Sequence, residues 1–350
     1  MRYEPLSTRV KQRLSSAAQS LRTANPTSFM QRMLDETFAL PANHPAYARN
    51  HLQPGAAPLE PTFAGARPGT LAFSLEPLGP EAGGSDRRDA ATHEMRRLVG
   101  GAFGGEALGW FDRSSEAYRG FTNGGALNYG AFFGSSFDRD GLQSANVVYE
   151  AGENRMGDLP SQLTALVGPV MSALPGLRPV FTTLIANRAH GQQKMTFLLT
   201  SLLRVADLQP ILTELGLGRQ LPGILQLLGV TLGGRFDLPA GSTLIALGQS
   251  PEGPEFELHV MLDAIPDLPA NFLQLLTLGL TERPRELTAL ERFMGAFTPT
   301  DGAWPGRFSI LGIKATPVGR PKVSLFLRPV EFEVDARALD PQTAPLSAYA

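Results

Sequence analysis

The chain has no cysteine among its 350 residues. This absence excludes a disulfide framework, a thiolate metal site and a cysteine nucleophile. The sequence also lacks any run of about 18 apolar residues, so it predicts no membrane span. The N-terminal stretch 1–16 has no apolar core behind its charges, so it does not resemble a secretory signal. We therefore expect a cytoplasmic protein.

The chain also has no large excess of positive or negative charge, because 31 basic and 33 acidic residues leave a net charge of −2. This balance gives no support to a nucleic-acid partner. Hydrophobic residues make up 43% of the chain, which is enough for a large core. Lysine is scarce beside arginine, so the position of each lysine is informative. The four lysines are Lys11, Lys194, Lys314 and Lys322.

The common motifs of nucleotide, metal and hydrolase sites are missing as well. No GxGxxG follows an expected strand, and no GxxxxGK[ST], HExxH, GxSxG or DDxxD occurs. The five histidines are scattered, with no pair at metal-ligand spacing. We therefore expect neither a bound metal nor another cofactor.

A strand–turn–strand–helix pattern occurs four times from residue 129 onward. The strand pairs are 129–137 with 144–151, 179–187 with 193–201, 242–250 with 255–264, and 306–316 with 321–334. Helical patterns lie between them at 160–174, 206–230 and 269–297. A strand at 70–77 and a helix at 90–102, capped by Asp89, indicate part of a fifth unit. Segments 9–24 and 28–39 predict two amphipathic helices, and 41–69 predicts a loop.

Adjacent hairpins separated by helices can close into an antiparallel barrel with the helices outside. The sequence therefore predicts an α+β fold of this kind. An open sheet and two stacked sheets remain alternatives. We expect N-terminal helices in 1–40, one barrel domain in 41–334 and a C-terminal tail in 335–350.

Side chains alternate between the two faces of a strand, so the second strands show what a barrel would enclose. Three such strands put polar residues on one face and Val, Leu or Phe on the other. The polar faces carry Lys194 and Thr196; Glu255, Glu257, His259, Met261 and Asp263; and Lys322, Ser324, Phe326 and Arg328. Lysine is unusual in strands, which favours a polar interior that can bind a ligand. The alternative is a one-sided sheet whose polar face contacts water.

Three stretches, AAPLEPTF (56–63), LAFSLEPLG (71–79) and KVSLFLRP (322–329), resemble segments of the aromatic prenyltransferases with an ABBA (αββα) barrel. The similarity is greatest to the tryptophan dimethylallyltransferase branch and extends over 41–334. It implies metal-independent transfer of a prenyl group from a prenyl diphosphate to an aromatic acceptor. In that family arginines and lysines hold the diphosphate and tyrosines shield the allyl cation. Glu60 matches the carboxylate that, in that family, hydrogen-bonds the aromatic N–H and helps take up the proton, ahead of the first core strand.

The chain departs from the family pattern at several cations. Ala72 stands where the family has an arginine, and Val147 and Tyr149 match a lysine and a tyrosine. Glu255, Glu257 and His259 replace an Arg-x-Lys-x-Tyr strand.

Three functions therefore stay open. The first is prenyl transfer to an indole or other aromatic acceptor. The second is a diphosphate-independent cyclase or isomerase that acts on a prenylated aromatic, with acid–base work by Glu60, Glu257, Asp263 or His259. The third is a non-catalytic binding barrel for an apolar small molecule or peptide. For transfer, the predicted catalytic residues are Glu60 and His259. The predicted substrate-binding residues are Lys194, Lys314, Lys322, Arg188, Tyr149, Thr196, Glu257, Met261, Ser324 and Phe326.

Overall fold

The computed structural model describes residues 4–119, 127–151 and 153–334. Ten antiparallel strands form a closed barrel in the order β1-β12-β11-β10-β9-β6-β5-β4-β3-β2. They are β1 Leu59–Ala64, β2 Leu71–Leu75, β3 Ala131–Asp138, β4 Gly141–Glu150, β5 Leu177–Asn187, β6 Gly191–Leu199, β9 Thr243–Ser250, β10 Gly253–Met261, β11 Gly306–Ala315 and β12 Lys322–Pro329. The predicted barrel is confirmed, and the open-sheet and two-sheet alternatives are wrong.

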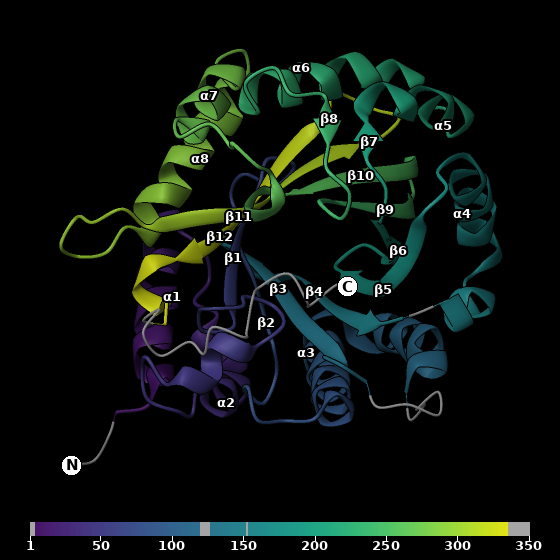
Figure 1. Ribbon diagram of the computed structural model, residues 1–350. Helices are drawn as coiled ribbons and strands as arrows, with labels where there is room; N and C mark the ends of the chain where they lie inside the picture. The colour runs from purple at the N-terminus through teal and green to yellow at the C-terminus, as the bar shows by residue number, and fades with distance from the viewer. Residues whose placement is uncertain (1–3, 120–126, 152, 335–350) are drawn as a thin grey trace.

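Helices surround the barrel on its outer side (Figure 1). They are α1 Leu6–Leu21, α2 Thr27–Thr37, α3 Gly84–Ser115, α4 Ser161–Ala173, α5 Leu208–Glu214, α6 Leu221–Thr231, α7 Phe272–Gly279 and α8 Pro284–Phe297. A small sheet of β7 Leu203–Arg204 and β8 Asp237–Leu238 lies apart from the barrel strands. No helix in the described part of the chain is both long enough and apolar enough to cross a membrane.

The barrel consists of five hairpins, and the first hairpin closes the ring. Strand β1 pairs with β2 on one side and with β12 on the other, where Thr62 lies opposite Phe326. The strand expected at 70–77 therefore belongs to a complete fifth unit. Because neighbouring strands alternate in direction, the five hairpin turns lie at the same end of the barrel, which we call the hairpin end.

Two expectations about the first unit were wrong. Segment 41–69, expected to be a loop, contains β1, so Glu60 lies in a core strand and not ahead of it. Helix α3 begins at Gly84 after Gly83, well before Asp89, which is therefore not its cap. The helix continues to Ser115 through a kink at Gly104, where φ is 85°.

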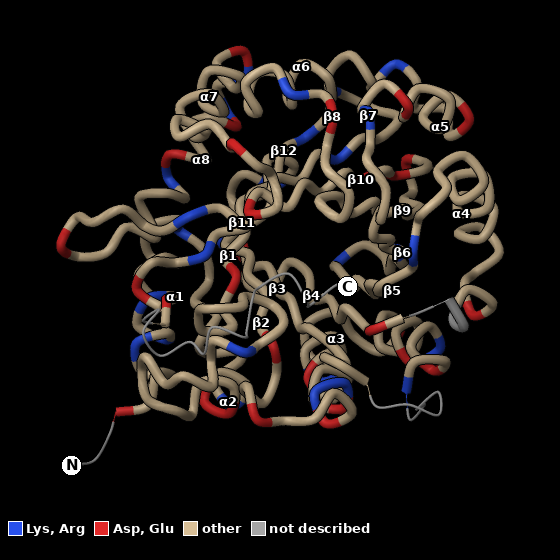
Figure 2. The backbone as a smooth tube through the Cα atoms, viewed as in Figure 1, with Lys and Arg blue, Asp and Glu red and all other residues tan. Residues whose placement is uncertain are grey.

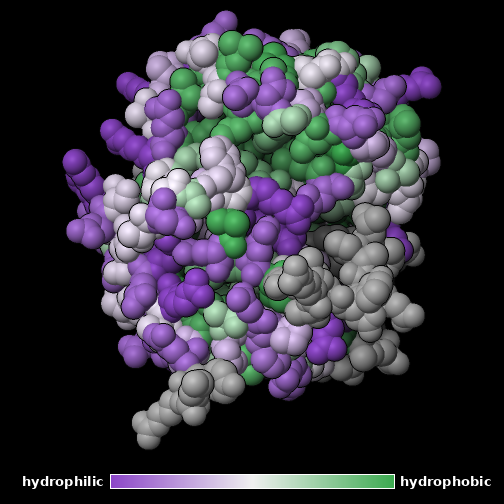
Figure 3. Space-filling model, turned by 60° about the vertical axis from the view of Figure 1, so that its left-hand side comes forward, coloured by the Kyte–Doolittle hydropathy of each residue, from purple (hydrophilic) through white to green (hydrophobic). Residues whose placement is uncertain are grey.

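The outer faces of the strands form the core with the helices. Phe256, Val323 and Leu325 are at most 1% exposed and belong to one hydrophobic cluster, as their alternation predicted. Charged residues of both signs are distributed over the helices and turns around the barrel (Figure 2). The face seen in Figure 3 mixes hydrophilic and hydrophobic residues, with a hydrophobic area in its upper half. The helices thus cover the apolar side of the barrel wall and leave the polar side to the lumen.

Candidate active site

The lumen of the barrel contains a cavity of about 340 Å³ to which all ten strands contribute. Nine of the twelve predicted site residues line it. They are Glu60, Lys194, Thr196, Glu257, His259, Lys314, Lys322, Ser324 and Phe326. The predicted polar interior is therefore correct, and the one-sided sheet with a polar face toward water is wrong.

Tyr149 does not line this cavity. Its side chain is 1% exposed and faces α3, where its hydroxyl lies 2.7 Å from the hydroxyl of Thr92. Its ring stacks on Tyr118 with the centroids 5.5 Å apart. Residues Asn146 and Val148 of the same strand face the lumen instead. The lumen face of β4 is thus the face opposite to Val147 and Tyr149, the two residues that the resemblance matched to a lysine and a tyrosine.

Arg188 and Met261 were also placed wrongly in the site. Arg188 lies in the β5–β6 turn, 41% exposed, with guanidinium nitrogens 2.7 and 2.8 Å from the carboxylate of Asp138. Met261 is the last residue of β10 and does not line the cavity. Asp263 lies just beyond it, half-exposed, in an ion pair with Arg307 at 3.2 Å. The polar face of β10 therefore contributes to the lumen only as far as His259.

A network of two lysines and two glutamates occupies the hairpin end of the cavity. The Lys194 Nζ lies 2.5 Å from Glu257 Oε1 and 3.1 Å from Glu255 Oε2. The Lys314 Nζ lies 2.7 Å from Glu255 Oε1. Gln192 donates a further hydrogen bond to Glu255 Oε2 at 2.8 Å. The two glutamates that replace the family's cations on β10 thus pair directly with Lys194 and Lys314.

These pairs determine the charges in the network. Burial alone would raise the pKa of Glu257, but Lys194, His259 and Lys314 outweigh it and hold the pKa well below its usual value. Burial alone would lower the pKa of Lys194, but Glu257 and Glu255 outweigh it and raise the pKa. At Lys314 burial and the nearby Lys194 prevail, so its pKa is lowered. Lys194 and Glu257 are therefore both ionised at neutral pH.

Small residues on β9 allow this network to form. Strand β9 lies between β6 and β10, with Gly248 and Ala246 on the lumen side. A Cβ added at Gly248 would lie 2.8 Å from the Cγ of Lys194. The side chains of Lys194 and Glu257 therefore reach across β9 through space that a larger residue would fill.

Two further cations lie at the hairpin end. Lys322 pairs with Glu286 of α8 at 2.7 Å and lies 42% exposed at the rim. Arg67, in the β1–β2 turn, donates to Gln143 Oε1 at 2.8 Å and to Ser144 Oγ at 3.3 Å. Its pKa is lowered because desolvation exceeds the attraction of Glu255 and Glu257. Within the described chain Arg67 has no carboxylate at ion-pair distance, so it is available to an incoming anion.

Glu60 lies toward the other end of the cavity and is 5% exposed. Its Oε2 accepts a hydrogen bond from Gln53 Nε2, which also lies 3.5 Å from Ser309 Oγ. Burial raises the pKa of Glu60 to about 8, although Gln53 and Ser309 lower it in part. Glu60 is therefore mostly protonated at neutral pH.

The loop that holds Gln53 is itself fixed by a buried carboxylate. Glu76 accepts hydrogen bonds from the backbone N–H groups of His51 and Leu52, at 2.7 and 3.1 Å. Glu76 also pairs with Arg87 at 3.0 Å. Glu76 thus positions Gln53, and through it the carboxyl of Glu60.

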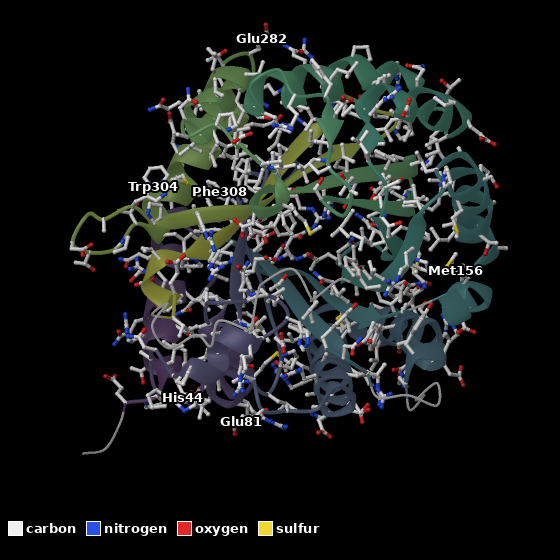
Figure 4. The ribbon with its side chains drawn as sticks, viewed as in Figure 1. His44, Glu81, Met156, Glu282, Trp304 and Phe308 are labelled. Carbon is white, nitrogen blue, oxygen red and sulfur yellow. The ribbon has the colours of Figure 1, made fainter. Side chains whose placement is uncertain are left out.

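Aromatic side chains form another part of the cavity wall. Phe132, Phe181 and Phe326 face the cavity, and the rings of Phe326 and His259 lie 5.7 Å apart. Trp304 lies on the loop before β11 and points away from the barrel (Figure 4), at 58% exposure. The cavity therefore offers an aromatic wall built from phenylalanine and histidine.

Arg67 and Gln53 were not among the predicted site residues. Both lie in 41–69, whose strand was not recognised. An expected hairpin at 59–75 would have put Arg67 at the same end as the lysines. No cluster of three or more His, Asp or Glu residues in the described chain could hold a metal ion.

The comparisons with known proteins bear on the fold. No family model and no curated protein matches the sequence. Solved structures match closely in fold. A 6-dimethylallyltryptophan synthase from Micromonospora olivasterospora, in complex with DMASPP and Trp, has a TM-score of 0.72 at 15% identity, covering 95% of this chain and 99% of that one. A 5-dimethylallyltryptophan synthase from Streptomyces coelicolor has a TM-score of 0.69 at 16% identity, covering 94% and 99%.

A more distant match is AnaPT from Neosartorya fischeri, with a TM-score of 0.61 at 12% identity and 87% of both chains covered. These similarities confirm that the chain has the ABBA barrel fold that the sequence resemblance implied. At such low identity they establish the fold and leave the reaction to the chemistry of the site.

Proposed function

We propose that this protein transfers a prenyl group from a prenyl diphosphate to an indole or other aromatic acceptor without a metal ion. One observation carries the proposal. A single barrel cavity has cations at the hairpin end, and aromatic rings together with the carboxyl of Glu60 deeper in the barrel. These groups match the three parts of the reaction, namely an anionic leaving group, an allyl cation and an aromatic acceptor. The solved dimethylallyltryptophan synthases with the same fold support it.

In this proposal Lys194, Lys314, Lys322 and Arg67 hold the diphosphate. Charge-assisted contacts of lysine and arginine to phosphate oxygens are the strong ones in proteins. The phenylalanines stabilise the allyl cation through their ring faces. Glu60, in its neutral form, donates a hydrogen bond to a polar group of the acceptor. Thr196 and Ser324 complete the wall around the substrates.

The lysines are already paired in this site, and this sets the cost of diphosphate binding. Glu255 and Glu257 neutralise the charges of Lys194 and Lys314. An anion must therefore displace a carboxylate from a lysine or rely on Arg67 and Lys322. This pairing favours the second candidate function, a cyclase or isomerase that acts on a prenylated aromatic and needs no diphosphate.

Both reactants are small molecules in this proposal, which includes no nucleic-acid partner. We further infer a cytoplasmic location, where prenyl diphosphates and free aromatic compounds are both accessible.

Two assays separate the candidates. The protein is incubated with dimethylallyl or geranyl diphosphate and a panel of indoles in the presence of EDTA, and product is detected by mass spectrometry. In parallel, inorganic pyrophosphate is titrated while the melting temperature is measured, because a ligand of the native state stabilises it. Transfer and a raised melting temperature are expected. If neither occurs while a prenylated aromatic still binds, the cyclase or binding-barrel function replaces the proposal.

A further inference from the structure

We propose that His259 is the base that removes the ring proton in this reaction, and that Glu257 and Lys194 position it. This inference rests on the proposed function and assigns the proton acceptor within it. A proton acceptor must reach the acceptor ring, must present a lone pair to the cavity, and must have a partner that stabilises its charged form. His259 meets these conditions by its place in the barrel.

Strand β10 puts Glu257 and His259 on the same face, two residues apart. The His259 Nε2 lies 3.3 Å from Glu257 Oε2. This contact favours the tautomer with the proton on Nε2, because a carboxylate accepts a hydrogen bond and cannot donate one. The other ring nitrogen, Nδ1, makes no hydrogen bond to any residue in the described part of the chain. It is therefore free to accept a proton inside the cavity that His259 lines.

The surrounding charges fit this role. Glu257 belongs to the same strand as His259, while Lys194 projects from β6, Lys314 from β11 and Lys322 from β12 into the same cavity. Lys194 at 2.5 Å keeps Glu257 ionised. The negative carboxylate beside the ring then stabilises the imidazolium that forms on proton transfer.

Glu60 fits the role of proton acceptor poorly. Its pKa of about 8 means that most of it already carries a proton at pH 7. A protonated carboxyl donates a hydrogen bond, so Glu60 suits holding the acceptor rather than deprotonating its ring.

Phe326 lies in the barrel wall between Glu60 and His259. Its strand, β12, pairs with β11 on the His259 side and with β1, which carries Glu60, on the other. Phe326 lies opposite Thr62, two residues from Glu60, and its ring is 5.7 Å from that of His259. An acceptor ring packed on Phe326 therefore lies between the carboxyl of Glu60 and the imidazole of His259.

The proton transfer follows bond formation to the prenyl group. The allylic C–O bond breaks and its electron pair leaves with the diphosphate. A ring carbon of the acceptor donates a π-electron pair to the allylic carbon, which forms the new C–C bond and a cationic ring. The Nδ1 of His259 then takes the proton from that ring carbon, and the C–H electron pair restores aromaticity. The imidazolium later releases the proton to water.

The test uses His259→Ala, with His93→Ala as the matched control, because His93 is exposed on α3 outside the cavity. We expect His259→Ala to reduce kcat by about 10²–10⁴-fold, the usual contribution of a general base. Added imidazole should restore part of the rate. An acceptor deuterated at the reacting carbon should react more slowly than the protonated one in His259→Ala, because proton removal then limits turnover. Pyrophosphate should still raise the melting temperature of the variant.

Glu257→Gln tests the positioning role. We expect the acidic limb of its pH–rate profile to move relative to wild type, while imidazole does not restore the rate. The inference is overturned if His259→Ala retains the wild-type kcat, or if its loss is neither rescued by imidazole nor accompanied by an isotope effect. A wild-type protein that transfers no prenyl group overturns the proposed function itself, and the assignment of His259 with it. The two failures are therefore distinguishable.

Discussion

At Glu60 a buried carboxyl remains neutral over a pH range in which the unfolded chain would ionise it. The pKa is about 8 in the folded protein and 4.5 as the ordinary value. Between these values the folded state binds more protons than the unfolded state, so the free energy of unfolding falls as pH rises. The slope from this group is at most about 1.4 kcal/mol per pH unit.

We predict that Glu60→Gln removes this slope. The variant should gain stability relative to wild type as pH rises from 5 to 8, measured by urea denaturation at each pH. Gln53→Leu, which leaves the carboxyl but removes its hydrogen-bond donor, is the matched comparison and should retain the slope. Equal pH dependence in wild type and Glu60→Gln would mean that Glu60 is ionised in the folded protein.

At Lys194 the charge has two carboxylate partners, and its loss should be costly. Lys194→Met leaves Glu257 buried with only weaker partners. Removing one member of a buried pair typically destabilises a protein by about 3–5 kcal/mol. We predict a loss of this order at pH 7, measured by chemical denaturation. The loss should shrink as pH falls below 4.5, because the stability that the depressed pKa of Glu257 contributes to the wild type is lost between the ordinary value and the lower folded value.

The double variant Lys194→Met with Glu257→Gln is the control for this prediction. It should recover much of the lost stability, because no buried charge then lacks its partner. If the double variant is no more stable than the single one, the ion pair does not set the stability of this site.

The lumen residues Lys194, His259 and Phe326 could be predicted from alternation alone, because a strand has only two faces. The pairing of Lys194 with Glu257 could not. Their strands β6 and β10 are not neighbours, and the contact depends on β9 lying between them with small residues. Such a contact depends on strand order and stagger, which the alternation within one strand does not specify.

At the scale of elements, a proline in β1 and the facing of β4 explain the two main errors in the predicted strands. Strand β1 was missed because Pro61 argues against a strand. The structure tolerates it because the pairing of β1 with β12 begins only at Thr62. Tyr149 was expected in the lumen from the family pattern, but its side chain lies on the other face of β4, against α3. Long repeats were thus predictable, whereas short strands and exact registers were not.

Strand β11 carries a glycine whose lack of a side chain keeps the lumen open. A Cβ added at Gly312 would lie 2.2 Å from the Oγ of Ser324 on the neighbouring strand. We predict that Gly312→Ala destabilises the protein by about 1–3 kcal/mol, the usual cost of overpacking. Adding Ser324→Ala should relieve the clash and restore most of the stability, measured by thermal unfolding. The prediction is wrong if the second substitution makes the first no better.

For the whole molecule, closure means that the barrel has no edge strand. In an open sheet β1 and β12 would be edges, with one row of backbone groups unpaired. Here they pair with each other, although Thr62 and Phe326 lie more than 250 residues apart in sequence. Their backbone amides should therefore open to solvent only when the barrel itself unfolds.

Native-state hydrogen exchange measures this directly. We predict that the amides shared between β1 and β12 are protected as strongly as those between β5 and β6, which lie far from the seam. Adding low urea should reduce the protection of both sets together, because both report global unfolding. Early exchange at β1 and β12 would show that the barrel opens at the seam while the other strands stay paired. Such a seam would also give substrates a lateral route into the cavity, so this measurement bears on how the site is reached.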